Sequence, residues 1–227
     1  MDEQERDAAK RSAGESAAAT VDDGAVVGLG SGSTAAHAVR ALGREVDAGL
    51  DVRGVPTSYQ AREVAIEAGI ELTTLDETDG HVDVAIDGAD QVAGADLVKG
   101  GGASHAREKV VDLAADRFLV VVDPTKRVET LDYPVPVEVL PDARATVANA
   151  VAELGGDPDL RRAAYKSGPV VTDNGNLVLD CDFGAVENPA ELAADLAPLP
   201  GVVEHGLFVD AADAVHVGGP DVTVERP

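Results

Sequence analysis

A glycine-rich segment near the N-terminus, residues 28–34, has the composition of an anion-binding turn. It follows an apolar run at residues 25–29 and opens a stretch of helix-forming residues, so we expect it to join a strand to a helix. Glycines let the backbone approach a ligand closely, and a helix N-terminus presents free N–H groups to an anion. No lysine precedes its serines or threonine, so it is not a Walker A loop. The alternative is a turn that serves packing alone.

Two aspartates, Asp87 and Asp90, follow an apolar run at residues 82–86, where a strand is expected to end. At the carboxyl end of a parallel strand, two carboxylates can accept hydrogen bonds from the hydroxyl groups of a sugar. Aspartate is also frequent in turns, where its side chain bonds to nearby backbone N–H groups. In a chain this acidic, the pair does not by itself decide between a binding site and a turn.

A lysine beside three glycines forms the third candidate segment, which consists of Lys99, Gly100, Gly101 and Gly102. Successive glycines cost backbone entropy on folding, so their presence needs a reason. A lysine held among exposed amide groups suits an anion or a developing oxyanion, and the alternative is a flexible surface loop. The chain has only five lysines, and two others, Lys10 and Lys126, could face the same anionic ligand.

The helix predicted over residues 104–116 contains Arg107, Glu108 and Lys109 in its first half. Its apolar stripe consists of Val110, Val111, Ala114 and Phe118. At 3.6 residues per turn, Arg107 falls on this stripe, Glu108 flanks it and Lys109 points away. Periodicity alone therefore predicts Arg107 as the inward-facing group, and a solvated helix end is the alternative for all three side chains.

The elements that must position these residues alternate between strands and helices. We expect strands at residues 25–29, 52–55, 82–86, 95–98 and 118–122. We expect helices at residues 3–19, from the glycine turn to about residue 42, at 60–68 behind the capping residues Thr57 and Ser58, and at 104–116. This alternation predicts an α/β fold with a Rossmann-like, doubly wound and mostly parallel sheet, whose ligands bind at the carboxyl ends of the strands.

The pattern changes after about residue 130. We expect strands at residues 135–140, 169–172, 177–181 and 202–209, with helices at 143–154 and 190–196. An Asn-Gly turn at residues 173–176 predicts a hairpin between the two middle strands. The order β-α-β-β-α-β is typical of a ferredoxin-like α+β domain.

The final segments, residues 214–217 and 222–224, are too short for a domain and are expected to rejoin the first sheet. We therefore predict an α/β catalytic domain made of residues 1–130 and 207–227. The ferredoxin-like domain, residues 131–206, would be inserted before the last strands of that sheet.

The charge of the chain limits its partners. Aspartate and glutamate number 42 against 18 lysines and arginines, which gives a formal net charge of −24. This excess argues against nucleic acid and against an anionic membrane surface as partners. The acidic residues are spread along the whole chain, which is typical of a solvated, self-repelling surface. We favour a sharper interpretation, adaptation to high salt, which predicts that stability depends on the concentration of potassium chloride.

A single cysteine, Cys181, excludes an intrachain disulfide and a multi-cysteine metal site. The five histidines show no metal-ligand spacing with one another. The N-terminal segment is charged and lacks the apolar core of a signal peptide, and no apolar run approaches the roughly 20 residues that span a bilayer. We therefore expect a cytoplasmic protein without a metal ion.

With these segments assembled, the chain resembles the ribose-5-phosphate isomerase A family along almost its whole length. The matching segments are GLGSGSTAAH, PTSYQARE, VDVAIDGAD, LVKGGGASHAREKVV, DPTKRV, PVPVEVLPDA, VVTDNGNLVLD and PGVVEHGLF. Three departures stand out: Ser31 replaces the usual threonine, Gln91 replaces the usual glutamate, and residues 104–105 are more polar than in the family.

The resemblance implies interconversion of D-ribose 5-phosphate and D-ribulose 5-phosphate through an enediolate, without metal or organic cofactor. It implies Glu108 as the base, against the periodicity argument, and Lys99 with the glycine amides as oxyanion stabilisers. Asp87 and Asp90 would bind hydroxyls and assist ring opening. The substrate-binding positions it implies are Ser31, Gly32, Ser33, Thr34, Gly88, Ala89, Gly100, Gly101, Gly102, Lys126 and Lys10. Members of this family are commonly dimers or tetramers, so a homodimer or homotetramer is expected.

Two other classes of function stay open at this point. A sugar-phosphate-sensing module would share the phosphate turn but would not require a base beside the lysine and glycine loop. A nicotinamide dehydrogenase is disfavoured, because Ser33 occupies the third glycine position of the fingerprint and Asp51 precedes its strand instead of following it. An assay with ribose 5-phosphate, with and without a chelator, distinguishes the three.

Overall fold

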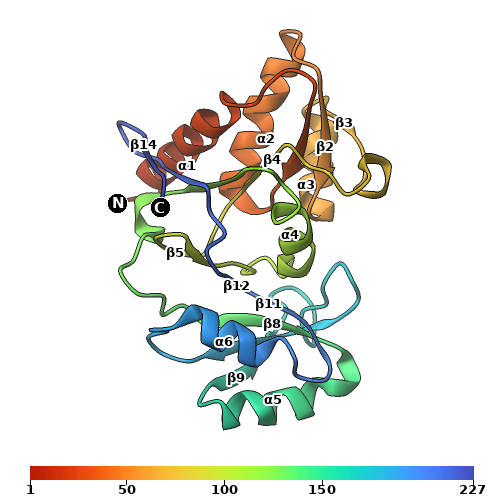
Figure 1. Ribbon diagram of the computed structural model, residues 1–227, viewed down its shortest axis with the longest axis vertical. Helices are drawn as coiled ribbons and strands as arrows, with labels where there is room; N and C mark the ends of the chain where they lie inside the picture. Colours follow the sequence, from red (N-terminus) through yellow and green to blue (C-terminus); the bar gives the residue numbers. More distant parts are fainter. The chain divides into compact units, whose positions relative to one another are not determined.

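A seven-stranded sheet forms the centre of the first of two units, and its strands arise from the apolar runs of the sequence (Figure 1). The computed structural model describes residues 1–227. The sheet order is β14-β13-β7-β4-β1-β2-β3, and all neighbours are parallel except β13 and β14. The strands are β1 (Ala25–Leu29), β2 (Val52–Pro56), β3 (Glu71–Leu72), β4 (Val84–Asp87), β7 (Phe118–Val122), β13 (Ala214–Val217) and β14 (Thr223–Glu225). The predicted mostly parallel sheet is confirmed, including the return of the C-terminal segments to it.

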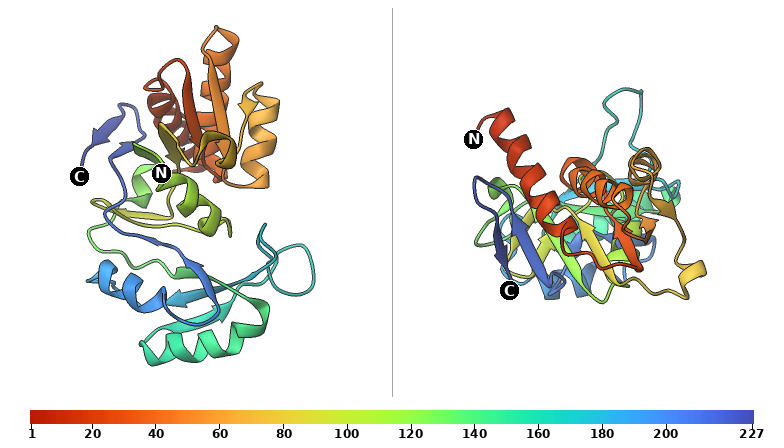
Figure 2. Two further views of the ribbon diagram at one scale, coloured as in Figure 1. Left: turned by 45° about the vertical axis from the view of Figure 1, so that its right-hand side comes forward. Right: turned by 90° about the horizontal axis from the view of Figure 1, so that it is seen from above.

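Helices cover both faces of this sheet because its strands are apolar on both sides. The helices of the unit are α1 (Glu3–Ala18), α2 (Gly32–Asp47), α3 (Tyr59–Glu67) and most of α4 (His105–Asp112). Successive strand residues point to opposite faces. Val27 of β1 joins one core with residues of α1, α2 and α3, whereas Val26 packs in another with Val111 of α4. Helices α1 and α2 lie side by side, as Figure 2 shows.

The helix ends follow the sequence signals only in part. Asp2 caps α1 in a capping box with Glu5, and Ser58 caps α3 by accepting a hydrogen bond from the N–H of Ala61. Helix α2 continues five residues beyond the expected end, to Asp47, whereas α4 ends at Asp112 instead of residue 116.

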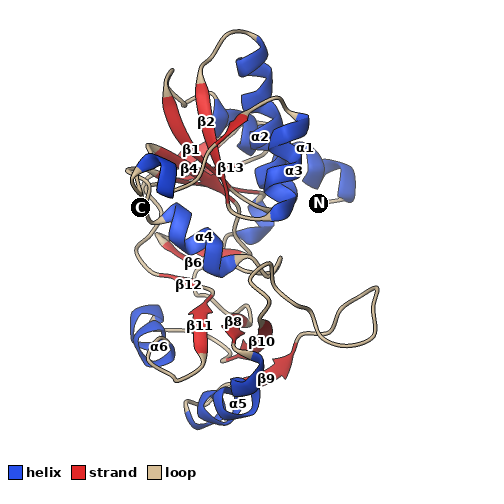
Figure 3. Ribbon diagram, turned by 90° about the vertical axis from the view of Figure 1, so that its right-hand side faces the viewer, coloured by secondary structure: helices blue, strands red, loops and turns tan.

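The second unit contains a four-stranded antiparallel sheet with two helices (Figure 3). Its elements are β8 (Val135–Val139), α5 (Arg144–Glu153), β9 (Asp157–Leu160), β10 (Leu177–Asp182), α6 (Pro189–Leu196) and β11 (Val202–His205). The order β11-β8-β10-β9 places the first and third strands in the centre, which is the ferredoxin-like arrangement and confirms that prediction. Val151 of α5 and Leu196 of α6 pack with Val137 of β8 in one core.

The predicted strand at residues 169–172 is wrong, since β9 pairs with β10 in its place. Strand β9 contains Pro158 between two aspartates, and all three residues have low β-propensity, so the sequence does not predict a strand here. Proline is tolerated because β9 lies at the edge of the sheet. The turn before β10 is held by side chains. The fully buried carboxylate of Glu138 accepts hydrogen bonds at Oε1 from Thr172, Asn174 and Asn176, at 2.9, 3.1 and 2.8 Å.

A small three-stranded sheet of the second unit has the order β12-β6-β5. Its strands are β5 (Gln91–Ala93), β6 (Asp96–Val98) and β12 (Leu207–Phe208). The single strand expected at residues 202–209 is thus two strands, divided at Gly206 between two sheets. By its contacts the second unit comprises Asp90–Ala106 and Val128–Asp210, so it also takes in a segment that the sequence-based division assigns to the first domain.

No helix of the chain combines the length and the apolar character that crossing a membrane requires.

Candidate active site

Three glycines, in β1 and in the turn that joins it to α2, are needed for steric reasons. A Cβ at Gly28 would lie 2.9 Å from Cγ1 of Val111, and one at Gly30 would lie 2.1 Å from Oδ1 of Asp87. Gly32 has a φ of +83°, which disfavours other residues. Packing therefore explains the first two glycines, as the alternative interpretation expected, and the anion-binding interpretation depends on residues 31–34.

The N-terminus of α2 is arranged to receive an anion. Ser31 stands at the N-cap position but does not cap the helix with its side chain. Its hydroxyl instead forms hydrogen bonds with Thr57 and Ser58, at 2.9 and 2.7 Å between oxygens. The first turn of α2, which includes Ser33 and Thr34, has no acidic residue despite the composition of the chain. Its N–H groups and the positive end of the helix dipole therefore favour a negatively charged ligand.

Two neighbours complete this end of α2. The ammonium of Lys10, on α1, donates a hydrogen bond to the Ser33 hydroxyl at 3.0 Å. The N–H of Gly32 donates to the side-chain carbonyl of Gln60, on α3, at 2.9 Å. Lys10 thus adds a positive charge beside the helix terminus, while its contact with a ligand stays a prediction. Nothing in the sequence indicated the supporting contacts of Gln60 and Thr57.

Asp87 links the end of β4 to the turn. Its buried carboxylate accepts, at Oδ1, the N–H of Ser31 at 2.9 Å and the N–H of Gly88 at 2.6 Å. Gly88 and Ala89 follow β4 and belong to no helix or strand. Because β1 and β4 are parallel neighbours, this carboxylate and the turn lie at the same carboxyl edge.

Lys126 belongs to the same edge. It ends the short 3-10 helix η2 (Pro124–Lys126), which follows β7 directly, and it is half-buried. Asp123 fixes the start of η2, because its Oδ1 accepts the N–H of Thr125 at 2.9 Å. Strand β7 is the parallel neighbour of β4, so Lys126 follows the strand beside the one that ends at Asp87.

Helix α4 reverses the orientation that periodicity predicted. Glu108 is buried, with 5% of its surface exposed, whereas Arg107 is half-buried and its guanidinium lies 5.6 Å from the ring centroid of Tyr59. Val110, placed on the predicted apolar stripe, is 61% exposed. The inward face contains Val111, three residues after Glu108, so counting Val110 into the stripe rotated the expected helix away from its true orientation.

The lysine and glycine loop lies in the second unit. Lys99 is 2% exposed, and its ammonium lies 5.4 Å from the ring centroid of Phe208, a cation–π distance. Its N–H donates to the carbonyl of Gly206 at 2.8 Å. A Cβ at Gly206 would lie 2.2 Å from the Lys99 carbonyl oxygen, so the segment at 205–208 needs a glycine where it passes the loop.

Asp90 forms a hydrogen bond with the loop, and His105 lies close to it. Gly100 has a φ of +104°, and a Cβ there would lie 2.6 Å from Nδ1 of the buried His105. The N–H of Gly101 donates to Oδ2 of Asp90 at 2.7 Å. Gly102 is exposed and has open space around the position of a Cβ. The loop is therefore fixed at Gly100 and Gly101, and accessible at Gly102.

Gln91, the departure from the family pattern, has a structural partner. Its side-chain oxygen accepts the N–H groups of Asp132 and Tyr133, each at 2.8 Å, and its amide nitrogen donates to the Asp132 carboxylate. A glutamate could not donate that last hydrogen bond.

One group of side chains has ligand atoms close enough to hold a metal ion, namely His81, Asp83 and Asp116, within 4.8 Å of one another. It lies before β4, at the opposite end of that strand from Asp87. Asp83 already accepts hydrogen bonds from the N–H of Val26 and from His81, at 2.7 and 3.1 Å. The hydrogen bond from Val26 lowers the pKa of Asp83 and connects this carboxylate to β1.

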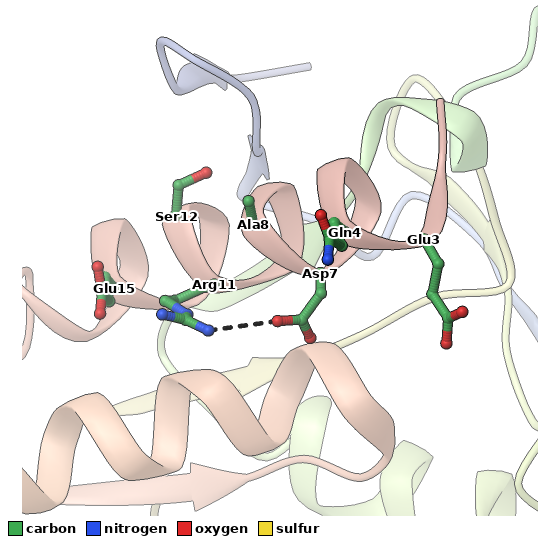
Figure 4. A pocket seen from close by; sticks show the side chains of 7 residues that line it. All are labelled: Glu3, Gln4, Asp7, Ala8, Arg11, Ser12 and Glu15. Atoms are coloured by element: carbon green, nitrogen blue, oxygen red, sulfur yellow. Dashed lines mark hydrogen bonds and ion pairs between the residues drawn. The ribbon is translucent and has the colours of Figure 1, made fainter.

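A surface cavity of about 620 Å³ is lined by residues of α1 alone (Figure 4). It is lined by Glu3, Gln4, Asp7, Ala8, Arg11, Ser12 and Glu15. Arg11 is paired with Asp7 at 3.3 Å, which leaves the lining acidic. A sugar phosphate is therefore not expected to bind in this cavity.

Comparison with known proteins points to one family. The family model described as ribose 5-phosphate isomerase A (phosphoriboisomerase A) matches residues 53–222. A ribose-5-phosphate isomerase A of Haloarcula marismortui is 68% identical over 96% of this chain and 95% of its own length. The corresponding protein of Natronomonas pharaonis is 65% identical, covering 95% of each chain.

Solved structures give the same result. Ribose 5-phosphate isomerase A from Methanocaldococcus jannaschii is 42% identical, with a TM-score of 0.92 over 96% of this chain and 98% of its own. A D-ribose-5-phosphate isomerase in complex with phospho-erythronic acid is 39% identical, with a TM-score of 0.95 over 98% and 99%. The sequence match and the structural match both extend over nearly the whole chain. This chain therefore belongs to the ribose-5-phosphate isomerase A family.

Proposed function

We propose that this protein interconverts D-ribose 5-phosphate and D-ribulose 5-phosphate. The observation that carries the proposal is the N-terminus of α2, where a chain of net charge −24 keeps the first helical turn free of acid and adds Lys10. The relative solved with phospho-erythronic acid supports it, because that ligand combines a phosphate with hydroxyls and a carboxylate.

The substrate phosphate is assigned to the turn. The N–H groups of Ser31 and Gly32 already donate to Asp87 and Gln60, so the N–H groups and hydroxyls of Ser33 and Thr34 would bind its oxygens. Lys10 and Lys126 would supply positive charge. These contacts are the same for aldose and ketose, so they provide binding energy without distinguishing the transition state.

Glu108 is assigned as the base. It would take the proton from C2 of the open-chain aldose, while the C2–H electrons form the C1–C2 double bond and negative charge moves to O1. The same carboxyl would return the proton to C1 as the O2 hydroxyl becomes the ketone and its proton is transferred to O1. The burial of Glu108 suits this role, because a carboxylate shielded from water is not weakened by hydration.

Lys99 and the glycine loop are assigned to the developing oxyanion. The N–H of Gly101 already donates to Asp90, so we assign the stabilising contacts to the Lys99 ammonium and the N–H groups of Gly100 and Gly102. Asp87 and Asp90 would hold the sugar hydroxyls and assist ring opening. No step of this scheme requires a metal ion or an organic cofactor.

A direct assay tests the proposal. Purified protein in molar potassium chloride is mixed with ribose 5-phosphate, and ketose formation is followed with and without a chelator and with and without NAD. We expect conversion that neither addition changes. Absence of conversion by folded protein would favour a sugar-phosphate sensor, and dependence on NAD or on a metal ion would contradict the isomerase.

The cellular setting follows from the same proposal. We place the activity in the non-oxidative pentose phosphate pathway, in the cytoplasm, with the chain acting as a homodimer or homotetramer. Dependence on high salt is supported by the net charge and by the haloarchaeal relatives. Unfolding measured across a potassium chloride series tests that point, since equal stability at low and multimolar salt would refute it.

A further inference from the structure

Arg161 joins the glycine loop to the four-stranded sheet of the second unit. It directly follows β9, and only 14% of its side chain is exposed. Its Nη1 donates to the carbonyl oxygens of Gly100 and Gly101, at 2.8 and 3.1 Å. These contacts span about sixty residues of sequence, and no motif in the sequence indicates them.

Asp180 of β10 fixes the other edge of the guanidinium. Its Oδ2 accepts from Nε of Arg161 at 2.9 Å, and its Oδ1 accepts from Nη2. The backbone of Arg161 is anchored as well, because its N–H donates to the carbonyl of Val178 at 3.0 Å. A paired, planar guanidinium has little freedom to rotate, so the direction in which Nη1 points is determined by the sheet.

The two carbonyl contacts orient the N–H groups of the loop. The Gly100 carbonyl shares its peptide with the N–H of Gly101, and the Gly101 carbonyl shares its peptide with the N–H of Gly102. No peptide bond of the chain is cis, so each carbonyl and its N–H point in opposite directions. Arg161 therefore directs the Gly101 N–H toward Asp90, where the structure has it, and directs the Gly102 N–H away from the guanidinium.

Three glycines in a row have little rigidity of their own, so this orientation must be imposed from outside the loop. The positive charge on Arg161 also polarises both peptides and makes their N–H groups stronger donors. We propose that Arg161, held by Asp180, is a positioning residue that preorganises the Gly102 N–H for the oxyanion. This inference rests on the proposed isomerase activity, and Arg161 acts through the loop without touching the substrate.

The test compares Arg161→Met with Arg162→Met, an exposed neighbour that loses the same charge. For Arg161→Met we expect kcat for ribose 5-phosphate to fall by about 100-fold, because misplacement of a catalytic group costs about that much, with little change in KM. For Arg162→Met we expect both constants to stay close to those of the unmodified protein.

Two inhibitors separate positioning from a general structural role. Phospho-erythronic acid carries a carboxylate as well as a phosphate, whereas inorganic phosphate probes only the phosphate site. Arg161→Met is expected to weaken inhibition by phospho-erythronic acid in proportion to the loss of kcat and to leave inhibition by phosphate unchanged. Equal weakening of both inhibitors, or an unchanged kcat, would overturn the inference.

Two milder variants keep the inference testable if Arg161→Met does not fold. Asp180→Asn keeps the shape of the side chain that binds Arg161 but removes its charge. Arg161→Lys keeps the positive charge but loses the planar guanidinium with its several N–H donors. Both are expected to show a smaller loss of kcat with the same selectivity between the inhibitors, and full activity in both would refute the inference. If the unmodified protein itself does not convert ribose 5-phosphate, the proposed function fails before the inference is reached.

Discussion

Two glycine-rich segments of this chain are fixed in different ways. The turn after β1 is held by its own sheet: the N–H of Gly30 donates to the carbonyl of Ile86, and Asp87 accepts the N–H of Ser31. Both partners lie on the neighbouring parallel strand. The loop at residues 99–102 is held mainly by side chains, those of Asp90 and Arg161, and the second lies about sixty residues away in the sequence.

The difference matches the roles that we propose for them. A phosphate changes little during the reaction, so a turn fixed against neighbouring elements of its own sheet is sufficient to bind it. An oxyanion is absent from the substrate and develops only as the proton leaves C2, so its donors must be oriented in advance. The side chains of Asp90 and Arg161, whose own positions are fixed, orient the donors of the loop. The comparison predicts binding defects from changes at the turn and defects in chemistry from changes around the loop.

The largest expected effect comes from the helix that follows the loop. Glu108→Gln removes the base but keeps the size of the side chain, so kcat should fall by about 10⁴-fold while KM changes little. Steady-state kinetics with ribose 5-phosphate, together with circular dichroism to verify folding, measures this. Near-normal turnover by a folded variant would remove Glu108 from the mechanism and contradict the assignment of the proton transfer to α4.

A pair of alanine variants tests how each segment is held. In Gly30→Ala the new Cβ would overlap the Asp87 carboxylate, so we expect a loss of about 1–3 kcal/mol in the free energy of unfolding and a strong loss of activity. In Gly102→Ala the new Cβ meets open space, so stability should change by less than about 0.5 kcal/mol. Urea denaturation measures both, and equal destabilisation would contradict the comparison.

Lys10→Met tests the prediction that changes beside the turn affect substrate binding. The ammonium that donates to Ser33 would be lost, and we expect KM for ribose 5-phosphate to rise about tenfold, with kcat unchanged. The matched control is Lys166→Met, which removes the same charge from an exposed position of the second unit. A fall in kcat without a change in KM would place Lys10 in the chemistry instead.

The smallest expected effect concerns the support of α1, the helix that carries Lys10. Burial lowers the pKa of His216 on β13, with a smaller contribution from Arg226, and its Nδ1 lies 2.9 Å from the hydroxyl of Ser16 on α1. As the pH falls below 6.5, the unfolded chain binds a proton that the folded chain resists, so the free energy of unfolding decreases.

His216→Gln should reduce this loss of stability between pH 6.5 and the lowered pKa, because glutamine does not titrate. Urea denaturation of both proteins at pH 7.5 and at pH 5 measures it. An identical decrease in the two proteins would show that other groups are responsible.

The same contrast explains what the sequence could predict. Central strands such as β1 and β7 are short apolar runs, and the bounds predicted for these two strands are the observed ones. The turn after β1 has its signals within seven residues. Strand β9 was missed because Pro158 and its neighbouring aspartates give no strand signal and their position on the sheet edge is visible only in three dimensions.

At the site, the limits were of the same kind. Periodicity chose Arg107 over Glu108, because Val110 is apolar but exposed, and a short helix offers too few residues to correct one misleading position. The resemblance to a family corrected that choice. Neither approach found Arg161, since its role depends on β9, β10 and the loop being brought together by the fold.

The donors at the start of α2 belong to the main chain, and this has an evolutionary consequence. A substitution can replace a side chain, but every residue except proline keeps its N–H group. The chain now has 42 acidic and 18 basic residues. The surface could gain these carboxylates one mutation at a time while the N–H groups at the start of α2 stayed in place. The side chain of Lys10 beside them has no such protection, because a single substitution removes its charge.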